Sequence, residues 1–267
     1  MEIESVSNTV SDHNRDLVGA LQKGLSVLEI LSRAPNSPSG MTLTEVAVEA
    51  GLPRAGARRL LLTLVASGYA RQEERRFVLS TKLLSLTRSW MGEASVWRYA
   101  EPIMLALSAR LGESCSAAVL EGDHIVYVAR AASRRILSVA LYVGARLPAH
   151  CTSMGRVLLS DLDSTELARF LAHASIGAKT AKTVTDRAIL AAKMAETRER
   201  GYAIVDEELE LGLRSIAVPV RDRSGKVVAA LNVSTQTARF TCAEMEQTIL
   251  APLLEAAGEI EDFLTLQ

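Results

Sequence analysis

The stretch Thr42–Leu64, TLTEVAVEAGLPRAGARRLLLTL, decides how the N-terminal part of this chain folds. Thr42 is a candidate N-cap, and Glu45 stands three residues later, which is the spacing of a capping box at a helix start. Gly51 suits the left-handed end of that helix, and Pro53 suits the first turn of a second helix. The stretch therefore predicts two short helices joined by a tight turn.

The second of these helices carries the residues that point to a function. Leu60, Leu61 and Leu64 recur at helical spacing and predict its buried side. The arginines that fall on or near the other side are Arg54, Arg58 and Arg59, and with Thr42 they are the candidate DNA contacts of this stretch. A helix, a turn and a second helix with arginine near its start form the layout of a DNA-reading helix-turn-helix. An ordinary helical hairpin with solvated arginines is the alternative.

The segment that follows, Gly68–Leu79 (GYARQEERRFVL), predicts two short strands around a polar tip at Gln72–Arg75. A hairpin directly after a recognition helix is a wing, whereas a solvated charged loop is the alternative reading. The wing residues placed to contact phosphates or a minor groove are Arg71, Arg75 and Arg76. Two acids, Glu73 and Glu74, stand at the tip and would repel phosphates, so we do not expect the tip itself to enter a groove.

Charge is distributed unevenly along the 267 residues, although the net charge is only −1. Asn14–Met91 holds 11 Lys and Arg against 6 Asp and Glu, and the remaining C-terminal part holds 19 against 22. A basic module beside a mildly acidic one is expected if only the first contacts DNA. We expect a disordered tail over 1–14, a winged helix-turn-helix domain over 15–80, a linker helix over 81–95 and a second domain over 96–267.

Several classes of protein are excluded by composition. The three cysteines show no C-x-x-C spacing, and with four scattered histidines they predict neither a metal site nor a cofactor. Sparse cysteines suit a reducing compartment, and the acidic N-terminus does not resemble a signal peptide. No apolar run approaches the roughly 20 residues of a membrane span. We therefore expect a cytoplasmic protein without a membrane partner.

The C-terminal part predicts an α+β domain with one mainly antiparallel sheet. Gly122-Asp123 is a hairpin signal between two of its strands, and Thr241 with Glu244 forms a second capping box. We expect Pro102 in the first turn of its helix and Pro252 to kink the terminal helix. The predicted strands are 115–121, 124–131, 136–143, 202–206, 215–221 and 227–234, with an irregular crossing over 146–151. The predicted helices are 99–111, 153–159, 165–173, 186–200 and 241–264.

Four segments resemble the IclR family of bacterial transcriptional regulators, and the resemblance runs from near Leu17 to the C-terminus. They are GLSVL from Gly24, TLTEVAVEAGLPRAGARRLLLTLVASGYARQ from Thr42, LPAHCTSMGRVLL from Leu147 and GYAIVDEELELGLRSIAVPVRDRSGKVVAALNVST from Gly201. The combination PRAGARR, GARLPAHCTSMGRVLL and EELELGLRSIAVPV is most similar to regulators of aromatic-acid catabolism, those of the protocatechuate and β-ketoadipate pathway.

The resemblance implies a winged helix-turn-helix domain that binds palindromic operator DNA, a linker helix, and a GAF-like effector domain that binds a small carboxylic acid. It also implies a homodimer or tetramer and no enzymatic activity. We expect the apolar linker helix, with Leu83, Leu84 and Leu86, to form part of the dimer contact. The chain departs from the family at Gly56, inside the recognition helix. Because Gly costs a helix about 1 kcal/mol relative to Ala, we expect this helix to become firm only on DNA.

The segment after Cys151 predicts an acid-binding helix start, since the first N–H groups of a helix lack partners and Gly155 allows a close approach. A plain capped helix is the alternative. By resemblance, the residues that line the effector pocket are Ser153, Met154, Gly155, Asp206, Ser215, Asn232 and Ser234. The arginines that could pair with an effector carboxylate are Arg130, Arg134 and Arg135, and a solvated strand end is the alternative for them.

Two other functions compete with this interpretation. His150 and Cys151 could form a nucleophilic pair in a hydrolytic enzyme, but adjacent residues on an extended stretch point to opposite sides, and no third orienting residue is apparent. A DNA-binding protein without a ligand is the second alternative. The long C-terminal part, which predicts a pocket, disfavours it.

Overall fold

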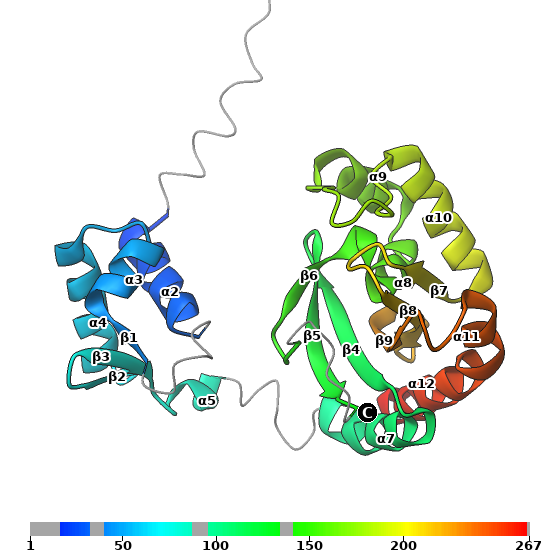
Figure 1. Ribbon diagram of the computed structural model, residues 1–267, viewed down its shortest axis with the longest axis horizontal. Coiled ribbons are helices and arrows are strands. Elements are labelled where there is room, and N and C mark those ends of the chain that lie inside the picture. The colour runs from blue at the N-terminus through cyan, green and yellow to red at the C-terminus, as the bar shows by residue number, and fades with distance from the viewer. Residues whose placement is uncertain (1–16, 33–39, 87–95, 134–140, 266–267) are drawn as a thin grey trace, which may run out of the picture. The chain divides into compact units, whose positions relative to one another are not determined.

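The computed structural model describes residues 17–32, 40–86, 96–133 and 141–265, in two compact units, Met1–Gly92 and Glu93–Gln267 (Figure 1). Several predictions fall outside the described residues. They are the disordered tail over 1–14, the linker helix beyond Leu86, the strand residues 136–140, and Arg134 with Arg135.

The N-terminal unit is a helix-turn-helix backed by one further helix and a small sheet. Its elements are α2 (Gly19–Ser32), β1 (Met41–Thr42), α3 (Leu43–Glu49), α4 (Arg54–Ala66), β2 (Ala70–Glu73), β3 (Arg76–Leu79) and α5 (Leu83–Leu86). The predicted capping box is confirmed: Glu45 N donates to Thr42 Oγ1 over 3.3 Å, and Thr42 N donates to Glu45 Oε2 over 2.7 Å. A core around Val27, Leu61 and Phe77 holds the helices on the sheet.

The predicted wing is confirmed as the antiparallel pair β2 and β3, with Glu73 opposite Arg76 and a two-residue turn between them. Glu74 in that turn has a φ of 54°, in the left-handed region that favours glycine. The sequence did not indicate β1, which adds a third strand through the pairing of Met41 with Phe77. This strand ties the start of the helix-turn-helix to the wing.

The second unit is an α+β domain with one antiparallel sheet, in the order β6-β5-β4-β9-β8-β7. Its strands are β4 (Ser114–Glu121), β5 (His124–Ala131), β6 (Arg146–Pro148), β7 (Ala203–Asp206), β8 (Leu213–Arg221) and β9 (Val227–Gln236). Its helices are α7 (Val96–Leu111), η1 (Ala149–Cys151), α8 (Ser153–Ser160), α9 (Ser164–His173), α10 (Arg187–Arg200), α11 (Cys242–Thr248) and α12 (Leu250–Thr265). Fold class and sheet type are as predicted.

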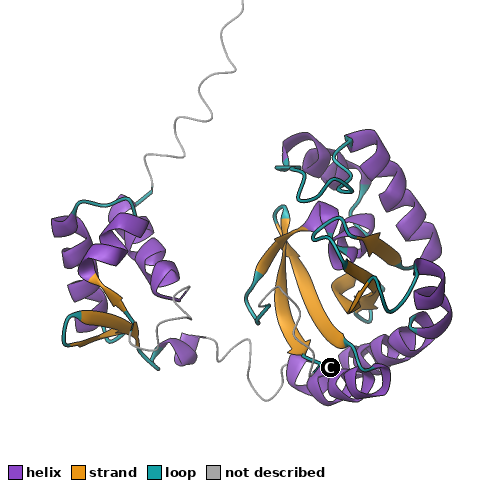
Figure 2. Ribbon diagram, in the orientation of Figure 1, coloured by secondary structure: helices purple, strands orange, loops and turns teal. Residues whose placement is uncertain are grey.

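Helices cover the two faces of this sheet, and each face has its own core (Figure 2). On one face, Met104 of α7 and Leu253 of α12 pack against buried strand residues such as Val218. On the other face, Leu159 of α8 and Met194 of α10 pack in a second cluster. The start of α8 is thereby fixed over the middle of the sheet, which positions the site described below.

Three local predictions were wrong. Residues 141–143 do not form a strand, and the edge strand is instead β6, in the segment predicted to be irregular. Pro102 lies inside α7, because that helix begins three residues before the predicted start. The terminal helix does not kink at Pro252. It divides at Ile249 into two helices, and Pro252 stands in the first turn of the second, where its missing N–H has no partner to lose. No described helix is both long and apolar enough to cross a membrane.

Candidate functional site

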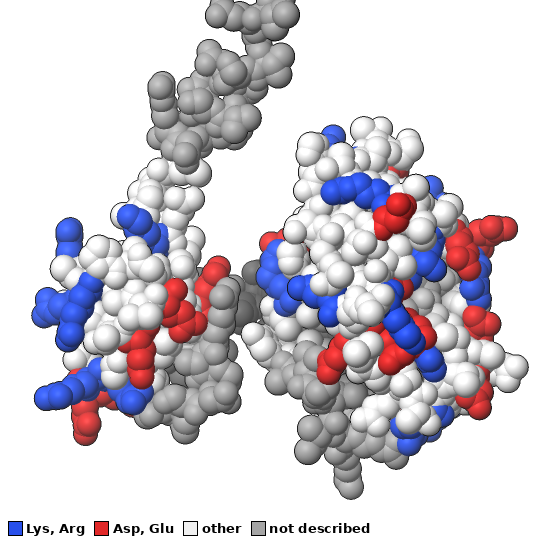
Figure 3. Space-filling model, turned by 45° about the horizontal axis from the view of Figure 1, so that its top comes forward, with Lys and Arg blue, Asp and Glu red and all other residues white. Residues whose placement is uncertain are grey.

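The recognition helix α4 presents a group of exposed cations to solvent. It buries Ala57, Leu61 and Leu64 against the core of the unit. The exposed residues on its other side include Arg54, Arg58 and Arg59. Within the described residues, none of these three guanidinium groups makes a hydrogen bond or an ion pair. Figure 3 shows Lys and Arg side chains gathered along the left edge of this unit.

The wing arginines differ in what they already contact. Arg76 is held inside the unit, since its Nη1 donates to the Gly40 carbonyl over 2.7 Å and lies 3.7 Å from Glu45 Oε2. Arg71 forms an exposed ion pair with Glu73 at 3.2 Å. Arg75 is exposed at the turn and has no partner among the described residues. Thr42, also predicted to contact DNA, uses its side chain to cap α3.

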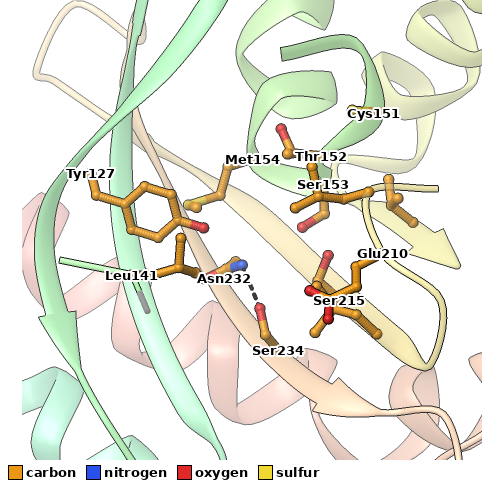
Figure 4. Close-up of a pocket in the computed structure, with 13 residues that line it drawn as sticks. Tyr127, Leu141, Cys151, Thr152, Ser153, Met154, Glu210, Ser215, Asn232 and Ser234 are labelled. Atoms are coloured by element: carbon orange, nitrogen blue, oxygen red, sulfur yellow. Dashed lines mark hydrogen bonds between the residues drawn. The ribbon is translucent and has the colours of Figure 1, made fainter. Parts of the chain in front are cut away.

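A pocket opens in the second unit between the start of α8 and the sheet (Figure 4). The space between its lining atoms, with the open mouth included, is about 580 Å³. The lining residues are Tyr127, Leu141, Cys151, Thr152, Ser153, Met154, Val205, Leu209, Glu210, Leu213, Ser215, Asn232 and Ser234. Within the part of the chain that the structure describes, no Lys, Arg or His lines this pocket.

The sheet register brings polar residues together on the pocket floor. Ser234 pairs with Ser215 on the neighbouring strand, and Asn232 pairs with Ser116. The Nδ2 of Asn232 donates to Ser234 Oγ over 3.0 Å. These polar side chains are set in a sheet face that is otherwise largely small and apolar, so they mark the position where a polar ligand group can be received.

Two buried polar atoms at this pocket have no hydrogen-bond partner among the described residues: Ser153 Oγ and Asn232 Oδ1. Ser153 is 1% exposed and Asn232 is 3% exposed. In Figure 4, Asn232 reaches up from the sheet and Ser153 faces the same space from α8. Because buried polar groups in native proteins nearly always have a partner, the two atoms indicate a site completed by a bound molecule.

The helix start above them offers backbone donors. The Thr152 hydroxyl caps α8 by accepting the Gly155 N–H over 3.1 Å. The N–H groups of Ser153 and Met154 have no hydrogen-bond partner among the described residues. They are the donors predicted for a carboxylate, and the helix dipole adds to their effect.

Gly155 is required for a reason that the sequence did not indicate. A Cβ on this residue would lie 2.0 Å from the carbonyl oxygen of Ala149 and 2.5 Å from its Cα. The glycine therefore lets α8 pack directly on the preceding turn η1. It does not line the pocket, and its N–H already has a partner in Thr152.

Asp206 also lies away from the pocket. Val205 lines the pocket, and the alternation of side chains along β7 turns Asp206 to the other face. There its Oδ1 accepts a hydrogen bond of 2.7 Å from Arg214 Nε. Lining residues that the sequence reasoning missed include Tyr127, Leu209 and Glu210, which come from elements far apart in the chain.

Arg130 lies beside the pocket through an irregularity in the sheet. In a regular strand, Tyr127 and Arg130 would face opposite sides, because they are three residues apart. The register between β4 and β5 shifts at Ala117/Ala118, which brings the two side chains to the same side. Tyr127 pairs with Ala118, and Arg130 pairs with Ser116. Ser116 in turn pairs with Asn232, so Arg130 shares the row that crosses the pocket floor. Burial raises the pKa of Tyr127 to about 12, and the nearby Arg130 charge opposes that rise.

His150 and Cys151 do not form a nucleophilic pair. The His150 Nε2 is 3.1 Å from the Gly177 carbonyl oxygen, and the Cys151 thiol is directed at the Pro148 carbonyl at 3.8 Å. Burial raises the pKa of the Cys151 thiol to about 11. Since the thiolate is the reactive form, this environment suppresses nucleophilic chemistry.

A winged helix-turn-helix and an α+β domain with a pocket lined by polar and apolar side chains define a class of DNA-binding regulators. Residues 20–74 match the IclR helix-turn-helix domain, and residues 89–262 match the bacterial transcriptional regulator IclR C-terminal domain. The chain belongs to the IclR family of transcriptional regulators. It is 41% identical to the Pca regulon regulatory protein of Pseudomonas putida, over 92% of this chain and 84% of that protein.

Other relatives agree with this assignment. The p-hydroxybenzoate hydroxylase transcriptional activator of Acinetobacter baylyi is 32% identical, over 93% of each chain. The structure of a regulator from Rhodococcus sp. RHA1 matches with a TM-score of 0.79 and 40% identity, covering 93% of this chain and 98% of that one. An IclR homologue from Microbacterium hydrocarbonoxydans complexed with 4-hydroxybenzoate matches with a TM-score of 0.78 and 27% identity, covering 92% and 98%.

Proposed function

We propose that this chain regulates genes of aromatic-acid catabolism and that a small carboxylic acid in the pocket changes its affinity for operator DNA. Ser153 Oγ and Asn232 Oδ1, which are buried at one cavity and have no hydrogen-bond partner among the described residues, carry the proposal. Relatives named for the Pca regulon and for p-hydroxybenzoate hydroxylase, and a homologue complexed with 4-hydroxybenzoate, support this ligand class.

The arrangement of donors and acceptors suggests how the acid is held. Its carboxylate accepts from the N–H groups of Ser153 and Met154, and a hydroxyl or other donor satisfies Asn232 Oδ1. Ser215 and Ser234 complete the polar floor. Arg130, at the end of the same row, supplies a cation for a second polar group of the ligand. Asp206 acts from behind the pocket wall, through Arg214.

For operator binding, we propose that Arg58 or Arg59 reads a base edge while Arg54, Arg71 and Arg75 bind phosphates. Replacing a base-reading arginine by Ala costs about 1–3 kcal/mol and relaxes specificity at one position. Replacing a phosphate-binding arginine weakens binding to all sequences and lowers the salt dependence by about one ion. Because Arg76 is already engaged with Gly40, Arg76→Ala is expected to loosen the wing instead.

We also propose that two copies bind a palindromic operator, since one winged helix covers one half-site. An apolar face on α2 supports this assembly. Leu21 is 61% exposed and Leu25 is 52% exposed, one helical turn apart, although large apolar side chains are normally buried. Leu86 of the predicted linker helix is also exposed.

Calorimetry with and without operator DNA tests the proposal. The panel is protocatechuate, 4-hydroxybenzoate, benzoate and β-ketoadipate, and at least one acid is expected to bind better than millimolar. Operator DNA should then shift that affinity by about 5–150-fold, because coupling is reciprocal. Ser215→Trp fills the pocket and should abolish binding, whereas Ser224→Trp, in the exposed β8–β9 turn, should not. Binding by the Ser215→Trp variant at wild-type affinity would place the ligand elsewhere.

A further inference from the structure

Behind the pocket wall, a buried ion pair joins α8 to the loop between β7 and β8. Arg156 Nη2 lies 2.6 Å from both Glu208 Oε1 and Glu208 Oε2. The two side chains are 3% and 7% exposed, so the pair is almost fully removed from water. Neither residue lines the effector pocket.

Each partner is attached to a different wall of that pocket. Arg156 follows Ser153 and Met154 within the first turn of α8. Glu208 directly precedes Leu209 and Glu210, which line the pocket from the loop side. The ion pair therefore bridges the helix start, with its backbone donors, and the loop that faces it.

The loop itself is braced around Glu208. The carboxylate also accepts the Val184 N–H over 3.0 Å, and the Glu208 carbonyl accepts from Thr183 Oγ1 over 2.6 Å. At the preceding residue, Glu207 Oε1 accepts the Gly212 N–H over 2.7 Å, which closes the loop on itself. Movement of Glu208 would thus carry the whole loop, including its pocket-lining residues.

Stability alone gives a weak reason for this pair. The desolvation of two charges largely cancels their attraction, and apolar replacements of buried pairs are often neutral for folding. Arg156 moreover places a positive charge in the first turn of α8, where the helix dipole disfavours it. Such a pair is better explained by the geometry it imposes on the two segments that it joins.

Building on the proposed function, we propose that Arg156 and Glu208 are positioning residues that clamp the β7–β8 loop against the start of α8 and so set the effector affinity. The clamp fixes the separation of the two pocket walls before the acid arrives. Ligand binding then does not have to order the loop, which is the general advantage of a preorganised site.

The first test separates folding from positioning. Arg156→Met/Glu208→Gln removes both charges, retains the side-chain volumes and keeps an acceptor for the Val184 N–H. Each single variant leaves one buried charge unpaired and should melt below the double variant. The double variant should regain a melting temperature near that of the wild type yet bind the acid that the wild type prefers about tenfold or more weakly, about 1.4 kcal/mol.

A matched control is available at the other end of α8. Asp161, the C-cap of this helix, lies 3.4 Å from Arg221 Nη1 and accepts the Val227 N–H over 3.0 Å. Asp161→Asn/Arg221→Met removes this pair without touching the pocket walls, and the acid affinity should stay within about twofold of the wild type. Equal losses from the two double variants would overturn the clamp, because a generally loosened α8 would then explain both.

A second test needs no ligand. Cys151 lines the pocket and is fully buried, and Cys115 is fully buried in the core on the other face of the sheet. In a Cys242→Ser background, the Arg156→Met/Glu208→Gln change should speed alkylation of Cys151 by iodoacetamide about tenfold or more, with Cys115 unchanged. An unchanged Cys151 rate overturns the clamp whether or not an acid binds. Absence of acid binding by the wild type would instead refute the proposed function.

Discussion

Replacing Gly155 by alanine probes the junction that positions the effector pocket. The added Cβ would lie 2.0 Å from the carbonyl oxygen of Ala149, well below any real carbon–oxygen contact. The nearest atoms belong to the backbone of Ala149, so α8 or the turn η1 has to move. Inserting a methyl group into a packed core costs about 1–3 kcal/mol, and this contact belongs at the upper end of that range.

The helix propensity of alanine works in the opposite direction. Alanine favours a helix by about 1 kcal/mol over glycine, so the expected net loss for Gly155→Ala is about 2 kcal/mol. In a domain of this size that corresponds to a fall of about 4–8 °C in the melting temperature of the second unit. The moved helix start should also weaken acid binding, because the N–H groups of Ser153 and Met154 change position.

Gly56→Ala is the matched control in the recognition helix. A Cβ there would meet no atom within 4 Å, so only the propensity acts. We expect the free energy of unfolding of the N-terminal unit to rise by up to about 1 kcal/mol. Binding to DNA should also become tighter if this helix is incompletely formed in the absence of DNA. Calorimetric melting of both variants is the assay. A Gly155→Ala variant as stable as the wild type would refute the packing argument.

Three further predictions concern single side chains. Glu74→Gly should stabilise the wing turn by about 1 kcal/mol, because glycine adopts the left-handed backbone without strain. Glu74→Gln should raise the DNA affinity and leave the melting temperature unchanged. Equal melting temperatures of these two variants would contradict this reasoning. Burial holds the pKa of His150 below its usual 6.5, so the free energy of unfolding should fall as the pH drops below 6.5, and His150→Gln should remove that part of the slope in urea titrations. Leu21→Glu should lower the dimer fraction in sedimentation without lowering the melting temperature; an unchanged dimer fraction would exclude this face of α2 from the interface.

Much of the fold could be predicted from short-range patterns. The capping boxes at Thr42 and Thr241 were read correctly because their hydrogen bonds join residues three apart. The hairpin at Gly122-Asp123 was equally local, since a two-residue turn determines the pairing of β4 with β5. The helix-turn-helix and the wing belong to the same group, so the DNA-reading unit was accessible from the sequence.

The effector pocket was only partly accessible, because its geometry depends on contacts between distant segments. The outward direction of Asp206 follows from the face of β7 that packs on α8, and the position of Arg130 follows from a register shift in β4 and β5. The Arg156–Glu208 pair joins residues 52 apart in the sequence. Local propensities and periodicities determined the elements of this protein, while the tertiary structure decided which side chains meet, since burial and strand register are properties of the assembled chain.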